Sequence, residues 1–413
     1  MRFMRGVETE LGLQFNNYDE LHRWSVEHPE QFWQLLWDHL QIVSSRNCDR
    51  VVTDADQFRA ARWFSGARLN FAENLLRNRS NKTALVARLE DGSRRVMSYA
   101  QLYEQVAQLA AALRRAGVAS GDRVAGFIPN VPEAVVAMLA CSSIGAIWSS
   151  CSPDFGINGV IDRFGQIEPK VLFACDGYYY NGKTFDSSQR LSEICRQIPS
   201  IQRRIIVPII DTDKDIPDSQ KYEDFLLTEN TPPLEFEQLP FDHPLYIVYS
   251  SGTTGVPKCI VHGAGGTLLQ QLKEHRLHVD LRSDDVLFYF TTCGWMMWNW
   301  LVAGLGSEAT LILYDGAPFF PSSSAMIDMI DAEQISVFGT SAKYIDGLQK
   351  SGATPGNSHK LDHLRLILST GSPLSHESFR YVYQNIKEDI CLSSISGGTD
   401  ILSCFVLGNP VMP

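Results

Sequence analysis

The segment Tyr249–Lys258 reads YSSGTTGVPK and directly follows the apolar run LYIV at 245–248. Residues of this kind cannot form a hydrophobic core, so we expect a buried strand to end here and a loop to begin. Because glycine reaches backbone angles that other residues avoid, Gly252 and Gly255 allow the loop to turn several amide groups toward one point. Such a concavity attracts anions, and the charge of Lys258 favours a polyphosphate. Further donors come from four hydroxyl groups, those of Ser250, Ser251, Thr253 and Thr254.

Two alternatives to this interpretation depend on the spacing of the glycines and the lysine. A GxxG pattern by itself is more often an ordinary glycine-rich turn than a phosphate site. A P-loop of the kinase or ATPase type is disfavoured, because Lys258 is followed by Cys259 and the spacing is not GxxxxGK[ST].

The composition excludes several classes of protein. The chain has 413 residues, 44% of them hydrophobic, and can bury at least one large core. A net charge of −11 argues against nonspecific binding to nucleic acid. The start of the chain carries no apolar signal segment, the longest apolar stretch, Ala134–Trp148, is too short to cross a bilayer, and the nine cysteines include no CxxC pair. We therefore expect a cytosolic protein without a membrane span, a disulfide framework or a zinc site.

Strand and helix patterns alternate along most of the chain. Residues 18–45 predict two helices that are broken near Pro29. From Thr83 onward, short apolar runs such as TALVA, RVAGF and VLFAC alternate with helical patterns, which is typical of a layered α/β fold with a mostly parallel sheet. A second series runs from the YSSGTTGVPK loop to the end, and the polar stretch 211–244 is interpreted as a connector between the two series.

Five motifs in order along the chain resemble those of the adenylate-forming enzymes, the family of the acyl-CoA synthetases. The string SSGTTGVPK resembles their phosphate loop, CGWMMW at 293–298 their aromatic acyl-pocket motif, STGSPL at 369–374 their adenine loop, and SGGTD at 396–400 their T-[ED] motif. WFSGARLNFAENLL at 63–76 resembles the entry segment of the short-chain members. The resemblance covers about Trp63 to Asp400.

This resemblance implies the large domain of adenylate-forming enzymes, with two α/β subdomains and a small β-rich subdomain. Residues 1–75 would form the N-terminal helical segment of the short-chain type, and residues 76–413 the AMP-binding domain. Family members continue past the T-[ED] motif with a mobile lid domain, so we expect the present chain to lack this lid, to end within the AMP-binding domain, and to turn over slowly or not at all.

The resemblance also implies an acid–thiol ligase. A carboxylate would attack the α-phosphate of ATP, pyrophosphate would leave, and coenzyme A would open the acyl-adenylate, with Mg²⁺ as metal. The segments CGWMMWNW, LILYDGAPF and SGGTDI are closest to members that activate acetoacetate, which would serve ketone-body use in lipid synthesis. A nucleotide-binding remnant without turnover, a ligase for another short acid and an oxidative, luciferase-like relative are the alternatives, and the oligomeric state stays open.

Individual roles follow by matching the motifs residue by residue. The loop Ser250–Lys258 would hold the β- and γ-phosphates, Thr399 would bind the α-phosphate, and Asp400 would bind Mg²⁺. For an isolated Thr-Asp pair, a helix N-cap is the alternative. The remaining ATP contacts are assigned to Gly371, Ser372, Pro373 and Gly398.

The acyl pocket is assigned to Trp295, Met296, Thr370 and Gly397, although the four large residues 295–298 could equally be core, with some pointing each way. Gly397 stands where acetyl-CoA synthetases carry a tryptophan, so its lack of a side chain would leave room for a longer acid. Arg163 resembles an arginine that meets the phosphates of coenzyme A, and a surface salt bridge is the alternative role.

Overall fold

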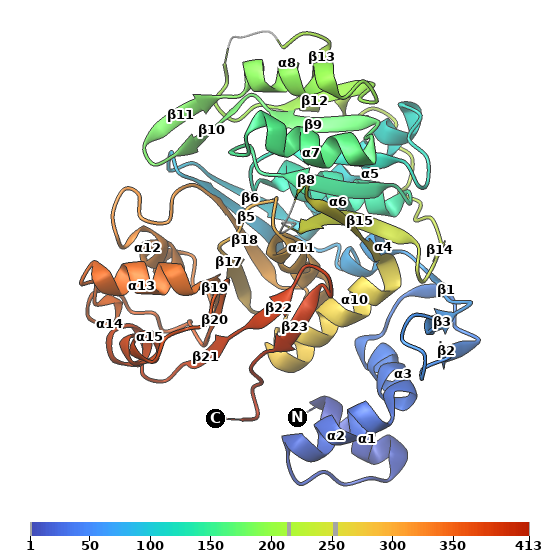
Figure 1. The fold of residues 1–413 in the computed structure, drawn as a ribbon, viewed down its shortest axis with the longest axis vertical. Coiled ribbons are helices and arrows are strands. Elements are labelled where there is room, and N and C mark those ends of the chain that lie inside the picture. Colours follow the sequence, from blue (N-terminus) through green and yellow to red (C-terminus); the bar gives the residue numbers. More distant parts are fainter. Residues whose placement is uncertain (1, 213–215, 251–254, 413) are drawn as a thin grey trace.

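The computed structural model describes residues 2–212, 216–250 and 255–412, and two seven-stranded sheets form its centre (Figure 1). Within each sheet, neighbouring strands run parallel except for one antiparallel pair at an edge: β15 with β16 in the first sheet and β5 with β6 in the second. The first sheet has the order β13 (Ser219–Lys221), β12 (Arg203–Val207), β9 (Val171–Cys175), β7 (Arg123–Phe127), β8 (Ile147–Cys151), β15 (Pro244–Ser250) and β16 (Lys258–Gly263). The second has the order β21 (Cys391–Ser394), β20 (Leu366–Thr370), β19 (Val337–Ser341), β17 (Val286–Tyr289), β18 (Thr310–Asp315), β5 (Thr83–Leu89) and β6 (Arg94–Ser98). The predicted α/β fold with mostly parallel sheets is confirmed.

The assignment of strands to the two sheets differs from the two consecutive series that the sequence predicts. The first strands of the series, β5 and β6, join the second sheet through β18, and β15 joins the first sheet through β8. The supposed connector at 211–244 is also wrong in part, because β13 extends the first sheet and the rings of Tyr222 and Phe225 in α9 (Tyr222–Phe225) are buried beside Phe173. A pattern of apolar residues predicts that a segment forms a strand. The neighbour with which the strand pairs depends on contacts with segments far along the chain.

Two helices fill the space between the sheets. Helix α5 (Tyr99–Arg115) packs against β5 and β6 of the second sheet, α6 (Pro132–Ser143) packs against β8 of the first, and the two helices contact each other. Ser98 forms a capping box with Gln101 at the start of α5, and the apolar stripe of α5 is fully buried. Almost every residue of α6 is buried, as expected for a helix with sheets on two sides.

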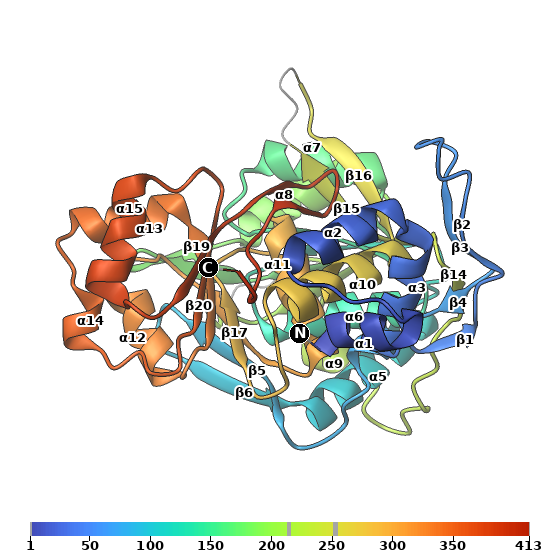
Figure 2. The ribbon, with the colours of Figure 1, turned by 90° about the horizontal axis from the view of Figure 1, so that it is seen from below.

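The N-terminal helices lie at one end of the molecule and cover α10 (Ala264–Lys273), as Figure 2 shows from below. They are α1 (Arg2–Leu11), α2 (Tyr18–Glu27) and α3 (Pro29–Leu40), and the predicted break at Pro29 is confirmed. A column of stacked rings fixes α3 to the rest: Trp37 lies 4.8 Å from Phe64, and Phe64 lies 4.9 Å from Phe241, measured between ring centroids.

Smaller elements complete the described chain. Strand β1 (Ser44–Arg46), β4 (Arg68–Leu69) and β14 (Leu239–Pro240) form a three-stranded sheet, and three hairpins pair β2 (Arg50–Thr53) with β3 (Arg62–Ser65), β10 (Gly177–Tyr180) with β11 (Lys183–Asp186), and β22 (Ser396–Gly398) with β23 (Ser403–Val406). The other helices are α4 (Phe71–Leu75), α7 (Ile157–Ile167), α8 (Ser188–Gln197), α11 (Met296–Ala303), α12 (Ala325–Ala332), α13 (Ala342–Lys350), α14 (Pro355–Ser358) and α15 (His376–Tyr381), with π-helical turns at Glu274–His278 and Val382–Ile386 and a 3₁₀ turn at Gly304–Ser307. In the part of the chain that the structure describes, none of these helices combines the length and the apolar character needed to cross a bilayer.

A buried polar cluster joins the two sheets. Asn130, in the loop after β7 of the first sheet, donates its backbone N–H to the Asp315 carboxylate at the end of β18, in the second sheet, at 2.8 Å. The side-chain oxygen of Asn130 accepts from the indole N–H of Trp298 in α11 at 2.9 Å. Asn130 and Trp298 are buried and Asp315 is half-buried. Loss of hydration raises the pKa of Asp315 to about 6, with Asp154 and Glu90 acting in the same direction and the hydrogen bond from Asn130 opposing them.

Substitutions at two adjacent glycines of α10 test how this helix packs against Phe241, the last ring of the stacked column. A Cβ added at Gly265 would lie 2.2 Å from the ring of Phe241, whereas a Cβ at the neighbouring Gly266 meets nothing within 4 Å. We expect Gly265→Ala to lower the free energy of unfolding by about 1 to 3 kcal/mol through overpacking, and Gly266→Ala to raise it by about 0.5 to 1 kcal/mol through helix propensity. Urea denaturation of both variants measures this, and equal effects would contradict the assigned packing.

Asp315 should make part of the stability depend on pH. Because its folded pKa is raised above the unfolded value, the folded state binds the proton more tightly, so this group's contribution to stability falls as the pH rises from about 4 to about 6 and is constant above. The variant Asp315→Asn keeps an acceptor for the Asn130 N–H and removes the charge. Its free energy of unfolding relative to the unsubstituted chain should therefore be higher at pH 7.5 than at pH 4.5, and a pH-independent difference would contradict the assignment.

Candidate functional site

Two of the predicted motifs, the adenine loop and the T-[ED] motif, lie where the parallel strands β20 and β21 end. Strand β20 ends at Thr370, and the exposed segment Gly371–Pro373 follows directly; Gly371 has a φ of 87°, which favours glycine. The neighbouring strand β21 ends at Ser394, paired with Ser369 of β20. Carboxyl ends of parallel strands are the usual place for nucleotides in open sheets.

Hydrogen bonds connect the predicted adenine loop to the chain after β21. The backbone N–H of Ile395 donates to the Ser369 carbonyl at 2.7 Å, and the Thr370 hydroxyl donates to the Ile395 carbonyl at 3.4 Å. The backbone N–H of Leu374 donates to the Ser394 hydroxyl at 3.3 Å. The segments 370–374 and 394–395 therefore form one surface, which leads into the hairpin of β22 and β23.

Thr399 and Asp400 lie in the turn of this hairpin, next to the last residue of β22, Gly398. The alternative of a helix N-cap for this pair is wrong, because no helix follows in the described residues. Asp400 is exposed and makes no hydrogen bond or ion pair within the described part of the chain, so its carboxylate oxygens are available to a ligand. A single carboxylate together with phosphate oxygens and water is a common ligand set for Mg²⁺, so the turn fits the predicted role.

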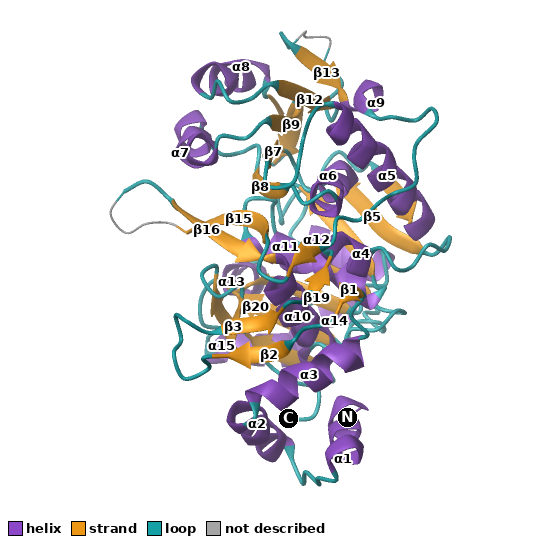
Figure 3. Cartoon of the chain, turned by 90° about the vertical axis from the view of Figure 1, so that its right-hand side faces the viewer, coloured by secondary structure: helices purple, strands orange, loops and turns teal. Residues whose placement is uncertain are grey.

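The phosphate-loop motif lies between the antiparallel strands β15 and β16, whose hairpin projects from the first sheet (Figure 3). Ser250 and Lys258 are paired across this hairpin, and Gly255 has a φ of 149°, a conformation that other residues rarely adopt. Lys258 and Gly255 are exposed. The other motif members, Ser251, Gly252, Thr253 and Thr254, lie outside the described residues.

One contact brings the phosphate-loop strand to the Thr399 turn. His262 in β16 lies with its Nε2 2.8 Å from the carbonyl oxygen of Thr399. Burial lowers the pKa of His262, while the Thr399 carbonyl and the nearby Asp400 act in the opposite direction. The edge strand of the first sheet and the hairpin that follows the second sheet along the chain therefore meet here, although 137 residues separate the two partners.

A buried carboxylate holds the strand that leaves the same turn. Glu274, which follows α10, accepts hydrogen bonds from the Ser403 hydroxyl at 2.9 Å, the Cys404 backbone N–H at 3.0 Å and the Trp300 indole N–H at 2.9 Å. Because Trp300 belongs to α11, Glu274 connects the helix of the acyl-pocket motif to the hairpin that carries Asp400. The sequence motifs pointed to neither His262 nor Glu274, because both act on a turn that is distant along the chain.

The acyl-pocket motif divides as predicted into buried and exposed residues. Trp298 is fully buried, Met296 is half-buried, and Trp295, the N-cap residue of α11, is 63% exposed. The preceding residues pack against the carboxyl end of β8, where the Ser150 hydroxyl donates to the Cys293 carbonyl at 2.7 Å. The motif thus lies at the junction of the two sheets, with Trp295 turned toward solvent.

Gly397 has a packing role that the sequence did not predict. A Cβ at this position would lie 2.2 Å from the Ser403 carbonyl oxygen of the paired strand β23. Glycine is therefore needed for the close approach of the two strands, whatever the size of the bound acid. Its assignment to the acid pocket stays a prediction, as does that of Gly398, whose added Cβ would meet nothing within 4 Å.

Arg163, the predicted coenzyme A contact, lies in α7 beside the strand that enters the phosphate loop. Its guanidinium lies 4.9 Å from the ring centroid of Phe155 and 5.5 Å from that of Tyr249, and donates to the Gly159 carbonyl at 2.7 Å. No carboxylate in the described residues pairs with it, so the alternative of a salt bridge is not supported. Cation–π contacts of this kind orient the guanidinium without neutralising it.

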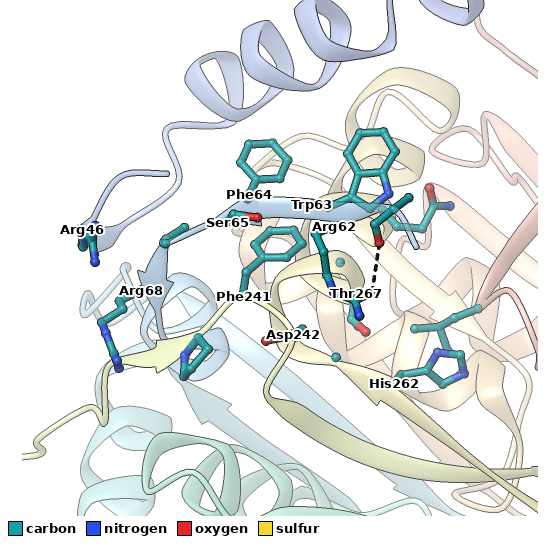
Figure 4. A pocket seen from close by; sticks show the side chains of 18 of the residues that line it. Arg46, Arg62, Trp63, Phe64, Ser65, Arg68, Phe241, Asp242, His262 and Thr267 are labelled. Atoms are coloured by element: carbon teal, nitrogen blue, oxygen red, sulfur yellow. Dashed lines mark hydrogen bonds between the residues drawn. The ribbon is translucent and has the colours of Figure 1, made fainter. Parts of the chain in front are cut away.

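A cavity of about 640 Å³ adjoins the site on the other side of His262 (Figure 4). Trp63, Phe64 and Phe241 form its aromatic wall, and it also reaches Ile401 and Leu402, the residues after the Thr-Asp pair. The start of the motif at 63–76 lines it, but none of the residues assigned to ATP, the acid or coenzyme A does. The sequence did not predict this cavity, because its walls come from segments that are distant along the chain.

Comparisons with known proteins support the motif assignment. The family model described as AMP-binding enzyme matches residues 71–406, and the model described as acetyl-coenzyme A synthetase N-terminus matches residues 18–75. The chain is 52% identical over 407 residues to the acetoacetyl-coenzyme A synthetase of Rhizobium meliloti (strain 1021), covering 98% of this chain and 62% of that protein. It is 47% identical to the acetoacetyl-CoA synthetase of Gallus gallus, covering 100% of this chain and 63% of that protein.

A solved structure agrees with these relatives. Acetoacetyl-CoA synthetase from Streptomyces lividans matches with a TM-score of 0.95 and 40% identity, covering 100% of this chain and 64% of that chain. The present chain thus spans less than two thirds of the length of the relatives it matches. The fold of adenylate-forming enzymes predicted from the motifs is confirmed, and the chain belongs to the AMP-binding enzyme family.

Proposed function

We propose that the chain activates acetoacetate with ATP and transfers the acyl group to coenzyme A. The observation that carries this proposal is the meeting of the phosphate-loop strand and the Thr399 turn at His262, in a chain whose similarity to acetoacetyl-CoA synthetases extends over nearly its full length. The contact of His262 with Thr399 supports a site that draws on both the edge strand of the first sheet and the turn after the second.

The reaction proposed has two balanced steps. A carboxylate oxygen of the acid attacks the α-phosphorus of ATP, the bond to the bridging oxygen breaks, and pyrophosphate leaves. The sulfur of coenzyme A then attacks the acyl carbon, AMP leaves with the electron pair of the broken C–O bond, and the thiol proton passes to solvent. Because each leaving group is a phosphate, the protein needs donors and positive charge rather than a nucleophile of its own.

The proposed ATP site combines residues from three segments. Ser250 and Lys258 would hold the β- and γ-phosphates, Thr399 would donate to the α-phosphate, and the exposed segment Gly371–Pro373 would contact the adenine. Asp400 would hold Mg²⁺, which neutralises charge on the phosphate oxygens. The contribution of 251–254 is proposed from the motif alone.

The acid and coenzyme A sites are proposed from the same resemblance. Acetoacetate would lie near Trp295, Met296, Thr370 and Gly397, and the phosphates of coenzyme A would approach Arg163, whose charge no described carboxylate neutralises. We further propose a cytosolic location and a role in the use of ketone bodies for lipid synthesis.

The proposal predicts exchange of labelled pyrophosphate into ATP that requires both acetoacetate and Mg²⁺, because only the first step has to run forward and back. Asp400→Ala should reduce the exchange rate by about 100-fold or more, on the scale of a lost electrostatic contact in a phosphoryl site. Asp389→Ala, at an exposed aspartate beyond the site, is the matched control and should leave the rate unchanged.

Calorimetric titration with MgATP separates this proposal from the alternatives. Binding of MgATP without acid-dependent exchange would support a nucleotide-binding protein without turnover instead. Exchange that is faster with acetate or 3-hydroxybutyrate than with acetoacetate would contradict the substrate assignment and leave the ligase chemistry in place.

A further inference from the structure

The Thr399 turn has little structure of its own. It connects two short strands, and its hairpin pairs only with itself in the described residues. A turn of this kind does not fix a side chain to the accuracy that phosphate and metal contacts need. Its orientation must therefore come from contacts with neighbouring elements.

Two contacts of different kinds supply this orientation. Glu274 binds Ser403 and Cys404, the first two residues of β23 directly after the turn, and so anchors the strand that leaves the turn. His262 binds the carbonyl of Thr399 itself, at 2.8 Å. Because this carbonyl belongs to the peptide that joins Thr399 to Asp400, rotation of the peptide would move both side chains.

We infer that His262 is a positioning residue, whose Nε2–H donates to the Thr399 carbonyl and thereby sets the Thr399 hydroxyl and the Asp400 carboxylate relative to the phosphate loop. This inference rests on the proposed function, in which these two residues bind MgATP. The inference does not require His262 to contact a substrate.

The placement of His262 in β16 supports this role. Side chains two and four residues apart in a strand point to the same face, so Lys258 and His262 share one face of β16 at a separation of about 13 Å. One rigid strand therefore carries both the lysine proposed for the phosphates and the group that holds the Thr-Asp turn. The distance between the two halves of the ATP site is then set by a strand and not by a loop.

The chemistry of the contact assigns the proton. A carbonyl oxygen can only accept, so Nε2 must carry the hydrogen. Burial lowers the pKa of His262, which favours the neutral ring with the proton on Nε2 at neutral pH. The contact therefore needs a donor at this position and does not need a charge.

The cavity beside His262 makes the contact open to substitution by a small molecule. His262 lines the cavity at the end opposite to Arg46 and Arg68 (Figure 4), and the volume of about 640 Å³ is much larger than an imidazole ring. Free imidazole can therefore reach the space that His262→Ala would leave.

The decisive comparison uses two variants of similar size. His262→Gln retains an N–H donor, whereas His262→Met lacks one. We expect His262→Met to raise the KM for MgATP in pyrophosphate exchange by about fivefold, the factor that corresponds to one net hydrogen bond. His262→Gln should stay within about twofold of the unsubstituted chain on the same scale, and the KM for acetoacetate should not change in either variant.

His243, directly before β15 of the same sheet, provides a matched control. Its Nε2 lies 2.9 Å from the Gly145 carbonyl oxygen, a contact of the same geometry away from the Thr399 turn. His243→Met should leave the KM for MgATP unchanged, and thermal unfolding of all variants records any general loss of stability. In His262→Ala, added imidazole should lower the KM for MgATP, and it should have no effect on His243→Ala.

The outcomes separate this inference from the function on which it rests. If the unsubstituted chain binds no MgATP and shows no exchange, the proposed function is wrong and the inference falls with it. If the unsubstituted chain exchanges pyrophosphate and His262→Met matches it or matches His243→Met, only the inference is overturned. Equal KM values for the Gln and Met variants, both raised, would likewise overturn the assignment of a donor role.

Discussion

The hydrogen bond between the Asn130 backbone and the Asp315 carboxylate is the constraint on which the arrangement of the site depends. It joins the loop after β7 to the end of β18, so it holds the carboxyl ends of two separate sheets next to each other. The indole of Trp298 adds the acyl-motif helix to the same cluster. A carboxylate with little access to water is costly, and here it is offset by the hydrogen bond through which Asp315 and Asn130 hold three segments together.

Near this junction, the site is formed by the edge hairpin of the first sheet and by the ends of strands in the second. The first sheet contributes its edge hairpin, β15 with β16, and the second sheet contributes the exits of β20 and β21 and the hairpin after them. His262 and Glu274 then fix that hairpin from two sides. The residues proposed to bind ATP are thus carried on short loops, and the elements that hold those loops are rigid strands and a buried helix.

The sequence predicts the local part of this structure and misses the distant part. The alternation of strands and helices and the break at Pro29 follow from patterns within a few residues, and the structure confirms them. Other features were not predicted. Strands β5 and β15 pair in sheets other than those expected from their order, and His262 contacts Thr399, so both features join segments that are distant along the chain. The close approach of Gly397 to Ser403 depends on how two strands pair. No local pattern encodes such pairs, so a motif identifies the residues of a site but not what holds them in place.

A crystal structure of the chain with Mg²⁺ and a nonhydrolysable ATP analogue tests the central claim most directly. The claim predicts that the phosphates lie between the hairpin of β15 and β16 and the Thr399 turn, with the metal on Asp400 and the adenine beside Gly371–Pro373. The cavity of about 640 Å³ between Trp63 and His262 would then contain no nucleotide. A nucleotide bound in that cavity, with Thr399 and Asp400 free of ligand, would contradict the account.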